Sequence, residues 1–442
     1  MKNEKHKSNR EQWAWYFYDF GNSAYAAVVL LAIYSAYFQG EVVGGSDGTR
    51  LWGIAIGIAM VVAGIISPIL GTIADHSGKK KPLLLAMTSL SIIFTALLFF
   101  VEKGSVFTGM LFFILAEIGY RGGQVFYNSL LPEIATQKEI AAVSGKGWAI
   151  GSAGGILCLV IVLGLILSFE GTFVVRLSFV ITAIFYALST IPLVFWIKEK
   201  AVPKSLEVGE NYLGLAIRKL KKTFKSVKDY KQFLRFMLAY LIYNDGILAA
   251  MDFAAILGAV LFGMEQQQLI IFMIIVQVFS VLGAYIYALI GERFGFKRGL
   301  IQSLLLMIAA VVGIYFNSGL TGFFIIGGVA GFALTGVQSL SRTMIGAFAP
   351  PGQSAEFFGF FGMVGRSSSF IGPFVFGYLA DKLVDFYAMQ GMILAEAEIL
   401  GHKQAIISIV VFLVLGLILL QRVNEEEGRK LSIVEDTSGS GD

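Results

Sequence analysis

The sequence predicts an all-α membrane protein with twelve transmembrane helices arranged in two six-helix, pseudo-symmetric halves. Three observations lead to this prediction: the composition, the number of long apolar segments, and motifs that recur between the halves. The 442 residues are 56% hydrophobic and 14% charged, and the mean hydropathy is +0.75. Soluble domains of this length have a much lower apolar content, so the composition indicates a chain that lies largely within a bilayer.

The apolar segments set the number of helices. A bilayer-spanning helix needs roughly 20 mostly apolar residues, and on this basis the chain divides into about twelve segments. We place them at 13–38, 52–74, 82–101, 106–131, 141–168, 173–197, 232–262, 268–291, 299–316, 320–347, 355–381 and 404–421. The predicted organisation is an N-terminal half at 1–197, a cytoplasmic basic linker at 198–231, a C-terminal half at 232–422 and a cytoplasmic tail at 423–442.

The basic loops predict the orientation in the membrane. Lysine and arginine gather in the N-terminus, at 79–81, 198–231 and 293–298, and in the tail, which all fall on one side of the predicted bundle. By the positive-inside rule that side is cytoplasmic. We therefore expect a multi-pass protein of the bacterial inner membrane with both termini in the cytoplasm. The first apolar segment lacks a signal-peptidase pattern and is interpreted as an uncleaved anchor.

The linker contains apolar residues at helical spacing, from Leu213 to Val227, opposite a face of lysines and arginines. This pattern predicts an amphipathic helix on the inner membrane surface, and a solvated linker is the alternative.

Several motifs recur between the halves. IADHSGKKK (Ile73–Lys81) recurs as IGERFGFKR (Ile290–Arg298), and GKGWAIGSAGG in the fifth segment corresponds to GRSSSFIGPF in the eleventh. One stripe of the fourth segment carries Glu117, Arg121, Gln124 and Asn128, and Gly331, Thr335, Gln338 and Arg342 have the same spacing in the tenth. A six-plus-six helical repeat is typical of secondary transporters, whose binding site lies between the repeats near the middle of the membrane.

These motifs resemble those of a known family. GTIADHSGKKK (Gly71–Lys81) is similar to the loop motif after the second helix of the major facilitator superfamily, with His76 in place of the usual Arg or Lys. The second copy departs at Ala288 and Glu292. YDFGNSAY, YNDG (Tyr243–Gly246) and the long stretch Gly336–Pro373 resemble the vacuole-effluxer-like branch, which is related to fungal exporters of amino acids from the vacuole. The resemblance implies a transporter and says little about its substrate.

Ionisable residues at membrane depth are candidates for function, because an unpaired charge costs at least a few kcal/mol there. Glu117 and Arg121 lie one helical turn apart and form either a structural pair or a substrate or proton site. Gln124 and Asn128 on the same stripe favour the wall of a wet cavity. Arg366 lacks a nearby carboxylate on its own helix, and Asp245 is its preferred partner. For Asp245 the alternative is a role in helix packing beside Gly246.

The first segment also carries polar residues. In the fold that the resemblance implies, the first, fourth, seventh and tenth helices line the central cavity. Asn22 and Tyr25 would then face the transport pathway, with Asp19 nearer the cytoplasmic gate. The alternative is that Gly21 and Ser23 allow close helix packing and that Asp19 only caps a neighbouring helix.

The loops after the second and eighth segments predict a gate. Asp75 is expected to face the positive N-terminus of the eleventh helix and to latch the outward-open state, and Glu292 is expected to do the same against the fifth helix. Lys79 and Arg293 belong to the same predicted gate.

The resulting hypothesis is a secondary active transporter that moves a small polar or zwitterionic solute, such as an amino acid, by alternating access. The expected substrate-binding residues are Asn22, Tyr25, Arg121, Gln124, Asn128, Asp245, Gln338 and Arg366. Proton coupling through Asp19, Glu117 or Asp245 is the favoured drive, and sodium is an alternative. The rival hypotheses are a lipid or amphiphile translocator of the same fold and a membrane sensor that does not transport.

An enzyme is not expected. The histidines His6, His76 and His402 all lie outside the predicted apolar segments, and the chain shows no metal-ligand spacing, nucleophile motif or phosphate-binding loop. With a single cysteine, Cys158, a disulfide framework is impossible. We expect no cofactor, no metal and no nucleic acid, but a monomer in contact with membrane lipids.

Overall fold

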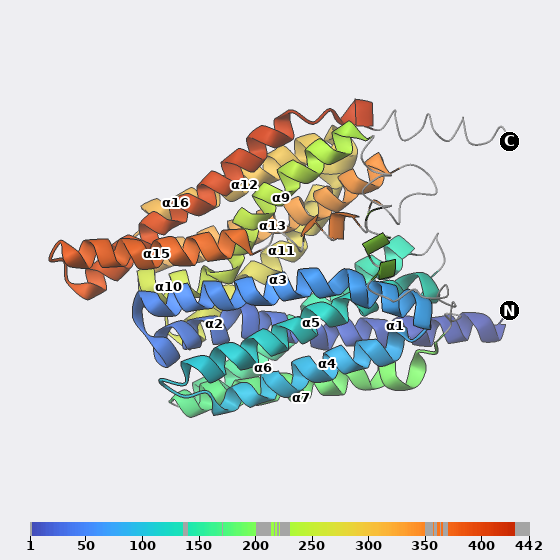
Figure 1. Cartoon of the computed structure of the whole chain (residues 1–442), viewed down its shortest axis with the longest axis horizontal. Helices are drawn as coiled ribbons and strands as arrows, with labels where there is room; N and C mark the ends of the chain where they lie inside the picture. Colours follow the sequence, from blue (N-terminus) through green and yellow to red (C-terminus); the bar gives the residue numbers. More distant parts are fainter. Residues whose placement is uncertain are drawn as a thin grey trace. The chain divides into compact units, whose positions relative to one another are not determined.

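The computed structural model describes residues 2–135, 140–169, 171–199, 214–215, 217–218, 221, 230–349, 357, 360–362, 364–365 and 370–428. Within these ranges all regular structure is helical (Figure 1). The first five helices are α1 (Lys2–Tyr25), α2 (Tyr34–Tyr37), α3 (Gly45–Ser77), α4 (Lys80–Leu97) and α5 (Val106–Ile134). They are followed by α6 (Ile140–Ser168), α7 (Thr172–Trp196), α9 (Lys231–Asp252), α10 (Ala254–Phe262), α11 (Gln266–Phe294), α12 (Phe296–Phe316), α13 (Leu320–Phe348), α15 (Ile371–Met389) and α16 (Leu394–Gln421). Shorter pieces are the π-helices η1 (Ala26–Ala32) and η2 (Phe38–Val43) and the 3-10 helix η3 (Leu98–Phe100).

Ten helical stretches of the described chain are long and apolar enough to cross a bilayer. Two further long helices are more polar. Helix α5 contains Glu117 and Arg121, and α15 contains Asp381, Lys382 and Asp385. Glu117 and Arg121 lie within the predicted fourth segment, whereas in α15 only Asp381, at the end of the predicted eleventh segment, lies inside its bounds.

The ends of several predicted segments differ from the structure, among them those of the eleventh and the twelfth. The eleventh was expected at 355–381, but its described helix α15 runs from Ile371 to Met389. The twelfth was expected to begin at residue 404, and α16 begins ten residues earlier, at Leu394. The added residues include charged and polar side chains, which hydropathy alone excludes from a span. The predicted amphipathic helix in the linker, the tail beyond Gly428 and Arg366 lie largely or wholly outside the described residues.

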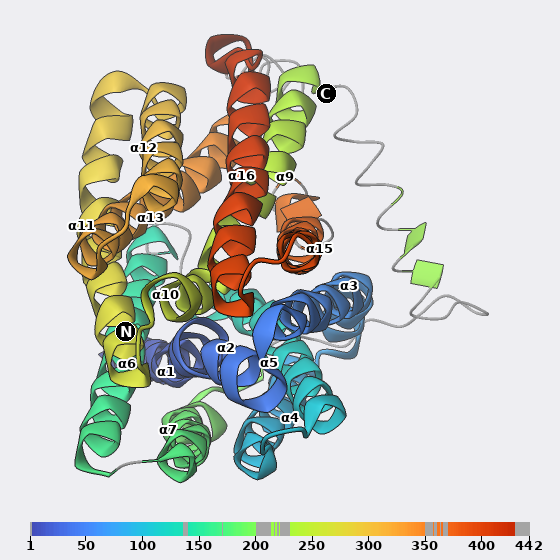
Figure 2. The same cartoon turned by 90° about the vertical axis from the view of Figure 1, so that its left-hand side faces the viewer.

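The chain divides into two compact units. Unit 1 comprises Met1–Ala216 and Asp252–Ile274, and unit 2 comprises Ile217–Met251 and Ile275–Asp442. In unit 1, α4 packs against α5, and α1 packs against α6 and α7 (Figure 1). In unit 2, α12 packs against α13 and α15 packs against α16 (Figure 2).

Two related motifs make the same kind of close helix contact in the two units. In α1, Gly21 lies against Ser189 of α7, and the backbone of the preceding Phe20 lies against Gly154 of α6. A methyl group at either glycine would collide with these atoms, so glycine is what allows the approach.

The second copy is YNDG in α9. Gly246 lies against Phe412 and Leu413 of α16, and the backbone of the preceding Asp245 lies against Gly372 of α15. YDFG and YNDG therefore occupy corresponding places in the two halves. The intramembrane carboxylate falls at the second position of one motif and at the third position of the other.

The repeated loop motif is explained by a glycine at the end of a helix. Gly78 follows α3 with φ of 65°, and Gly295 follows α11 with φ of 94°. Such positive φ angles are strained for residues with a side chain, and glycine therefore ends both helices.

The seventh span is broken. Phe253, with φ of −107° and ψ of 1°, separates α9 from α10. Helix α10 contacts α2 and η1 of unit 1. At the break, Trp52 of α3 donates its indole N–H to the backbone carbonyl of Asp252 at 3.0 Å, a buried contact. A carbonyl near a helix end needs such a donor, so Trp52 fixes the break in place.

Candidate functional site

A buried charged cluster occupies the middle of α5. Arg121 donates from its Nε to Glu117 Oε1 at 2.7 Å, and the hydroxyl of Tyr25 donates to Glu117 Oε2 at 3.0 Å. Glu117 is fully buried, whereas 21% of the Arg121 side chain is exposed. The guanidinium also lies over the ring of Tyr120, 5.3 Å from its centroid. Both carboxylate oxygens of Glu117 are thus satisfied, and Arg121 is held with part of its side chain exposed.

Asp252, at the helix break, belongs to the same cluster. Its side chain is 2% exposed, and it lies within electrostatic range of both Arg121 and Glu117. Among the described residues, its buried Oδ2 has no hydrogen-bond partner. The sequence analysis did not include Asp252 in the site. The feature of the sequence that could have pointed to Asp252 is its position seven residues after Asp245 in the same apolar segment.

The polar stripe of α5 becomes more exposed along the helix. Glu117 is buried, Arg121 and Gln124 are partly exposed, and Asn128 is exposed. The described residues offer Gln124 and Asn128 no hydrogen-bond partner. These two amides are therefore available to a solute or to water.

The corresponding stripe of α13 has the same gradient with different chemistry. Gly331 and Thr335 are buried, Gln338 is partly exposed and Arg342 is exposed. Thr335 donates its hydroxyl to the carbonyl of Gly331, at 3.2 Å, within its own helix. This copy has no counterpart of the Glu117–Arg121 pair within the described part of α13.

Asp245, in α9, is a buried carboxylate of unit 2. It is 1% exposed, its carboxylate faces the backbone N–H of Gly372, and its Oδ1 has no hydrogen-bond partner among the described residues. Its expected partner, Arg366, lies outside those residues, so the Asp245–Arg366 pair stays a prediction.

In α1, Asn22 lies in a helix contact. It is 2% exposed, and its side-chain oxygen accepts a hydrogen bond from the hydroxyl of Tyr186 at 3.0 Å. The hydroxyl of Tyr18 lies 2.9 Å from both that of Tyr186 and that of Thr88. This network joins α1 to α4 and α7. In this network the side-chain oxygen of Asn22 and the hydroxyls of Tyr18, Tyr186 and Thr88 bond to one another.

Asp19 lies at the contact between α1 and α6. Its carboxylate is so close to Gly151 that a methyl group there would overlap it, and Ser23 borders the same spot. The side chain is partly exposed. Gly151 thus provides the space that a carboxylate between two helices requires.

The predicted gating residues are only partly described. The side chains of Asp75 and Glu292 lie outside the described residues. Lys79 is exposed, and its backbone N–H bonds to Ser77 Oγ at 3.2 Å. Arg293 is exposed, with its guanidinium 5.7 Å from the ring centroid of Phe294.

The lysines that follow Lys79 make a reciprocal contact between α4 and the end of α7. Glu199 accepts hydrogen bonds from the backbone N–H groups of Lys80 and Lys81, at 2.8 and 3.2 Å. In return, Lys81 Nζ donates to the carbonyls of Val194 and Ile197, at 2.6 and 2.8 Å. The carboxylate satisfies a helix N-terminus and the ammonium satisfies a helix C-terminus, in accordance with the two helix dipoles.

Unit 2 repeats this contact between α12 and the end of α16. Glu425 accepts from the backbone N–H of Lys297 at 3.0 Å, and Lys297 Nζ donates to the carbonyls of Gln421 and Val423, at 3.0 and 2.7 Å. We call these two contacts the helix-end clamps. The sequence analysis missed them, although Glu199 and Glu425 each follow shortly after the last apolar segment of a half.

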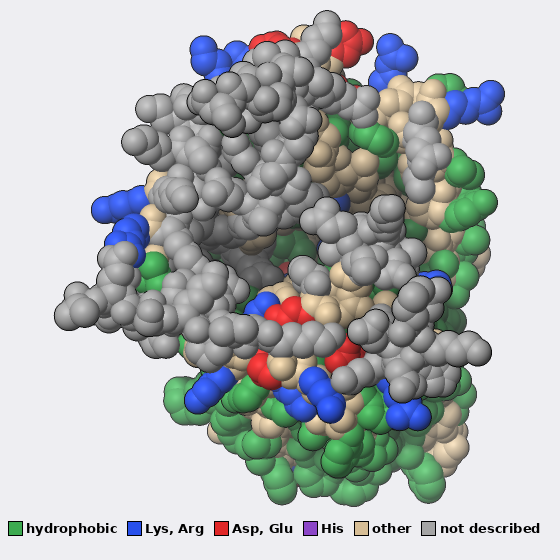
Figure 3. Space-filling view, turned by 90° about the vertical axis from the view of Figure 1, so that its right-hand side faces the viewer, with side chains coloured by type: hydrophobic (Ala, Val, Ile, Leu, Met, Phe, Trp, Pro, Cys, Tyr) green, Lys and Arg blue, Asp and Glu red, His purple; other side chains and the backbone are tan. Residues whose placement is uncertain are grey.

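The helix ends are charged and the helix sides are apolar. Figure 3 shows lysine, arginine and acidic side chains near one another at the helix ends of one face, with hydrophobic side chains covering the surface beside them. This distribution fits helix ends in water and helix sides in lipid.

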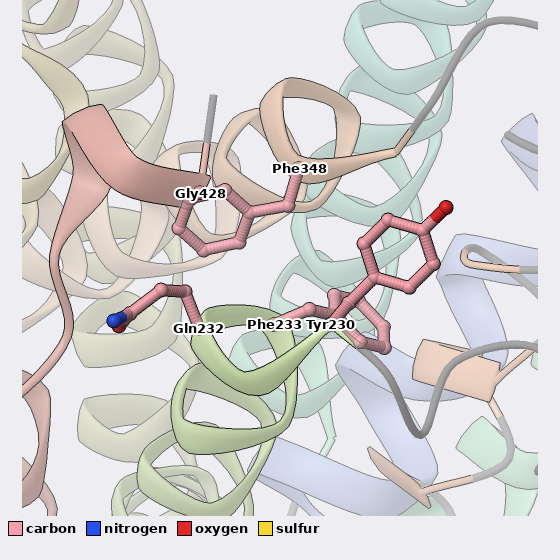
Figure 4. Close-up of a pocket in the computed structure, with 5 residues that line it drawn as sticks. All are labelled: Tyr230, Gln232, Phe233, Phe348 and Gly428. Carbon is pink, nitrogen blue, oxygen red and sulfur yellow. The ribbon is translucent and has the colours of Figure 1, made fainter. Parts of the chain in front are cut away.

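A small recess in unit 2 is not a solute site. Tyr230, Gln232, Phe233, Phe348 and Gly428 line it (Figure 4). It encloses about 170 Å³ of empty space, including open solvent, and leaves no room for the centre of a water molecule. In Figure 4 aromatic rings take up most of the recess. It is a packing feature beside the end of α9.

The prediction that His402 lies outside the apolar segments was wrong. His402 is fully buried in α16, and its Nδ1 lies 2.8 Å from the carbonyl oxygen of Glu398. The neighbouring Gly401 allows α16 to approach the backbone of Val384 in α15. The polar ring can be buried because the close helix contact and the backbone bond compensate for lost water.

The chain is similar in sequence to known membrane transporters. The sequence profile of the family described as vacuole effluxer Atg22 like matches residues 52–432. The Bacillus subtilis protein named uncharacterized MFS-type transporter YxiO is 27% identical, over 96% of this chain and 97% of its own length. Autophagy-related protein 22-1 of Neosartorya fischeri is 24% identical, over 68% of this chain. The match spans about half, 51%, of that fungal relative.

Solved structures share the fold. A bacterial homolog of the human lysosomal transporter Spinster, in an inward-facing and unoccupied conformation, has a TM-score of 0.71 at 15% identity and covers 97% of this chain and 98% of that chain. A D-xylose–proton symporter has a TM-score of 0.65 at 14% identity and covers 95% of this chain and 98% of that chain. These likenesses confirm the predicted all-α fold of twelve helices in two six-helix halves.

Proposed function

Since the chain belongs to the family of vacuole effluxer Atg22-like proteins, which are membrane transporters and not enzymes, we propose that it carries a small polar or zwitterionic solute. We further propose that the solute resembles an amino acid and that it crosses the inner membrane by alternating access.

The observation that carries this proposal is the way Arg121 is held. Glu117 and the ring of Tyr120 fix the guanidinium, and the described residues bond only its Nε. The terminal N–H groups therefore stay available for a carboxylate, which a guanidinium binds in a bidentate manner. The partial exposure of Arg121 and the free amide of Gln124 one turn away support the binding of a polar solute at this stripe.

The remaining residues have proposed roles around this anchor. Asp245 would bind an ammonium group, and Arg366 a second carboxylate or Asp245 itself. Tyr25 would orient Glu117, and Asn22 would keep α1 in register through Tyr186. Further polar contacts would come from Gln124, Asn128 and Gln338. Asp19, Glu117 and Asp245 are the proposed proton carriers, and Asp75, Lys79, Glu292 and Arg293 the proposed gating residues.

The orientation is part of the same proposal. The clustering of lysine and arginine supports cytoplasmic termini and a cytoplasmic linker at 198–231. Tags at these three sites should all be protected from an impermeant reagent in intact cells. Labelling of any one of them from outside would overturn the orientation.

The function is tested with purified protein in liposomes. We expect counterflow of a radiolabelled mixture of the twenty L-amino acids into liposomes preloaded with the same mixture. Replacing a charged contact to substrate costs about 1.5–3 kcal/mol, so Arg121→Gln should slow counterflow on the order of 10- to 100-fold. Arg422→Gln, an exposed arginine just after α16, is the matched control and should leave the rate unchanged.

Because Arg121→Gln leaves Glu117 buried without its cation, misfolding must be separated from lost binding. The double variant Glu117→Gln/Arg121→Gln removes both charges and should fold but transport slowly. A double variant that transports at the wild-type rate would remove the pair from the binding site. A folded wild-type protein without counterflow of any amino acid would refute the solute class.

A further inference from the structure

The buried cluster of unit 1 does not balance its charge. Two carboxylates, Glu117 and Asp252, are 0% and 2% exposed, and Arg121 is the cation beside them. With all three ionised, the cluster has a net charge of −1. An uncompensated buried charge costs several kcal/mol, so the cluster favours binding one further positive charge.

The hydrogen bonds identify which carboxylate would accept it. Glu117 has both oxygens engaged, one by Arg121 and one by Tyr25. Asp252 Oδ2 is buried, and the described residues give it no hydrogen-bond donor. A bare buried oxygen favours the neutral acid, whereas a carboxylate with two donors does not.

The groups around Asp252 can be assigned element by element. From α5, the charged side chains within range are Arg121 and Glu117. Helix α3 contributes Trp52, which bonds to the Asp252 backbone and does not titrate. Helices η1 and α2 contact α10, which follows Asp252. Helix η1 reads AAVVLLA, without a titratable group, and the hydroxyls of Tyr34 and Tyr37 of α2 donate to the carbonyls of Gly109 and Val101.

We propose that Asp252 binds a proton in this cluster and exchanges it during the transport cycle. The proposal rests on the proposed transport function and names the site of its proton coupling. The proton comes from water and returns to it, with no other bond made or broken. When Asp252 is protonated, one carboxylate faces one guanidinium and the cluster is neutral.

Loss of the proton acts on α10. Asp252 lies at the break before α10, which contacts α2 and η1. When Asp252 is ionised, the net charge of −1 makes this docked arrangement of Asp252–Ile274 less stable. Proton binding thus favours docking of α10, and proton release favours its departure.

The proton can be observed without any substrate. Infrared spectra of the full-length purified protein at neutral pH should contain the C=O stretch of a protonated carboxyl group, and Asp252→Asn should remove that contribution. Asp252→Glu should restore a carboxyl band, which separates loss of the proton site from misfolding. Asp385→Asn, at an exposed ion pair with Lys382, is the control that should leave the band unchanged. A band that persists in full in Asp252→Asn would overturn the proposal.

Transport measurements test the exchange. Asp252→Asn should retain counterflow of the L-amino-acid mixture and lose uptake driven by a pH gradient. Accumulation at the wild-type level in this variant would overturn the coupling role. The alternative is that the further positive charge bound by the cluster is an ammonium group of the substrate. In that case the wild-type protein without substrate would lack the C=O band of protonated Asp252, and this result would also contradict the proposal. If instead the protein moves no amino acid, the substrate-free spectra still test the proton site on their own.

Discussion

The two halves of this protein use the same helix contacts and different chemistry. YDFG in α1 and YNDG in α9 pack their glycines against the last helix of each half, and the helix-end clamps of Glu199 and Glu425 repeat one arrangement. The middle of α5, however, holds a buried ion pair, whereas the corresponding stripe of α13 has Gly331 and Thr335. The duplicated architecture is thus retained at helix ends and contacts, while the buried ion pair is present in only one of the two stripes.

The reason for the difference lies in how closely the helices approach. Gly331 brings α13 so near Val276 of α11 that a methyl group would overlap the Val276 backbone. A charged side chain has no space at that position. At the corresponding position of α5, Glu117 instead faces Tyr25 of α1. One copy of the stripe therefore contributes helix packing and the other contributes a polar cluster.

The largest expected effect comes from breaking the ion pair. Glu117→Ala removes the hydrogen-bonded partner of Arg121 and should lower the free energy of unfolding by about 3 kcal/mol. This value is at the low end for buried pairs because Arg121 is partly exposed and Asp252 lies within its electrostatic range. Thr335→Val, in the neutral copy, removes only a bond to its own helix and should cost under about 1 kcal/mol. Denaturant titration in mixed micelles measures both. Equal losses would contradict the assignment of the buried ion pair to only one of the two stripes.

A smaller effect is expected from the tyrosines that face the two stripes. The hydroxyl of Tyr25 donates to a carboxylate, and that of Tyr243 lies 2.7 Å from Ser341 Oγ. Hydrogen bonds to charged groups contribute about 1.5–3 kcal/mol and neutral ones about 0.5–1.5 kcal/mol. Tyr25→Phe should therefore destabilise the protein more than Tyr243→Phe in the same titration. The reverse order would show that Glu117 is not ionised.

The smallest effect is expected at the helix-end clamps, where the halves should behave alike. Glu199→Gln and Glu425→Gln each replace a carboxylate at a helix N-terminus by a neutral amide. Such a carboxylate contributes about 0.3–1 kcal/mol to the free energy of unfolding. Glu425 is partly buried and Glu199 exposed, so Glu425→Gln should cost slightly more. Added salt should reduce the effect of Glu199→Gln first, because exposed charges are screened most. A loss above this range at only one clamp would contradict their equivalence.

The sequence by itself determined the parts that depend on local pattern. Apolar runs of spanning length identified the helices, the recurring glycine and lysine motifs identified the two halves, and the spacing of Glu117 and Arg121 placed their ion pair one turn apart on α5. These features need only neighbours along the chain. The same reasoning missed the polar first turns of α16, because hydropathy assigns charged residues and a histidine to water.

Only the tertiary structure decided which polar groups meet. It placed Asp252 beside Glu117 and Arg121, brought Trp52 to its carbonyl, and joined Glu199 to the start of α4. Each of these groups is stabilised by a partner far away along the chain. The free energy of burying a polar group depends on that partner, and packing of the helices is what supplies it.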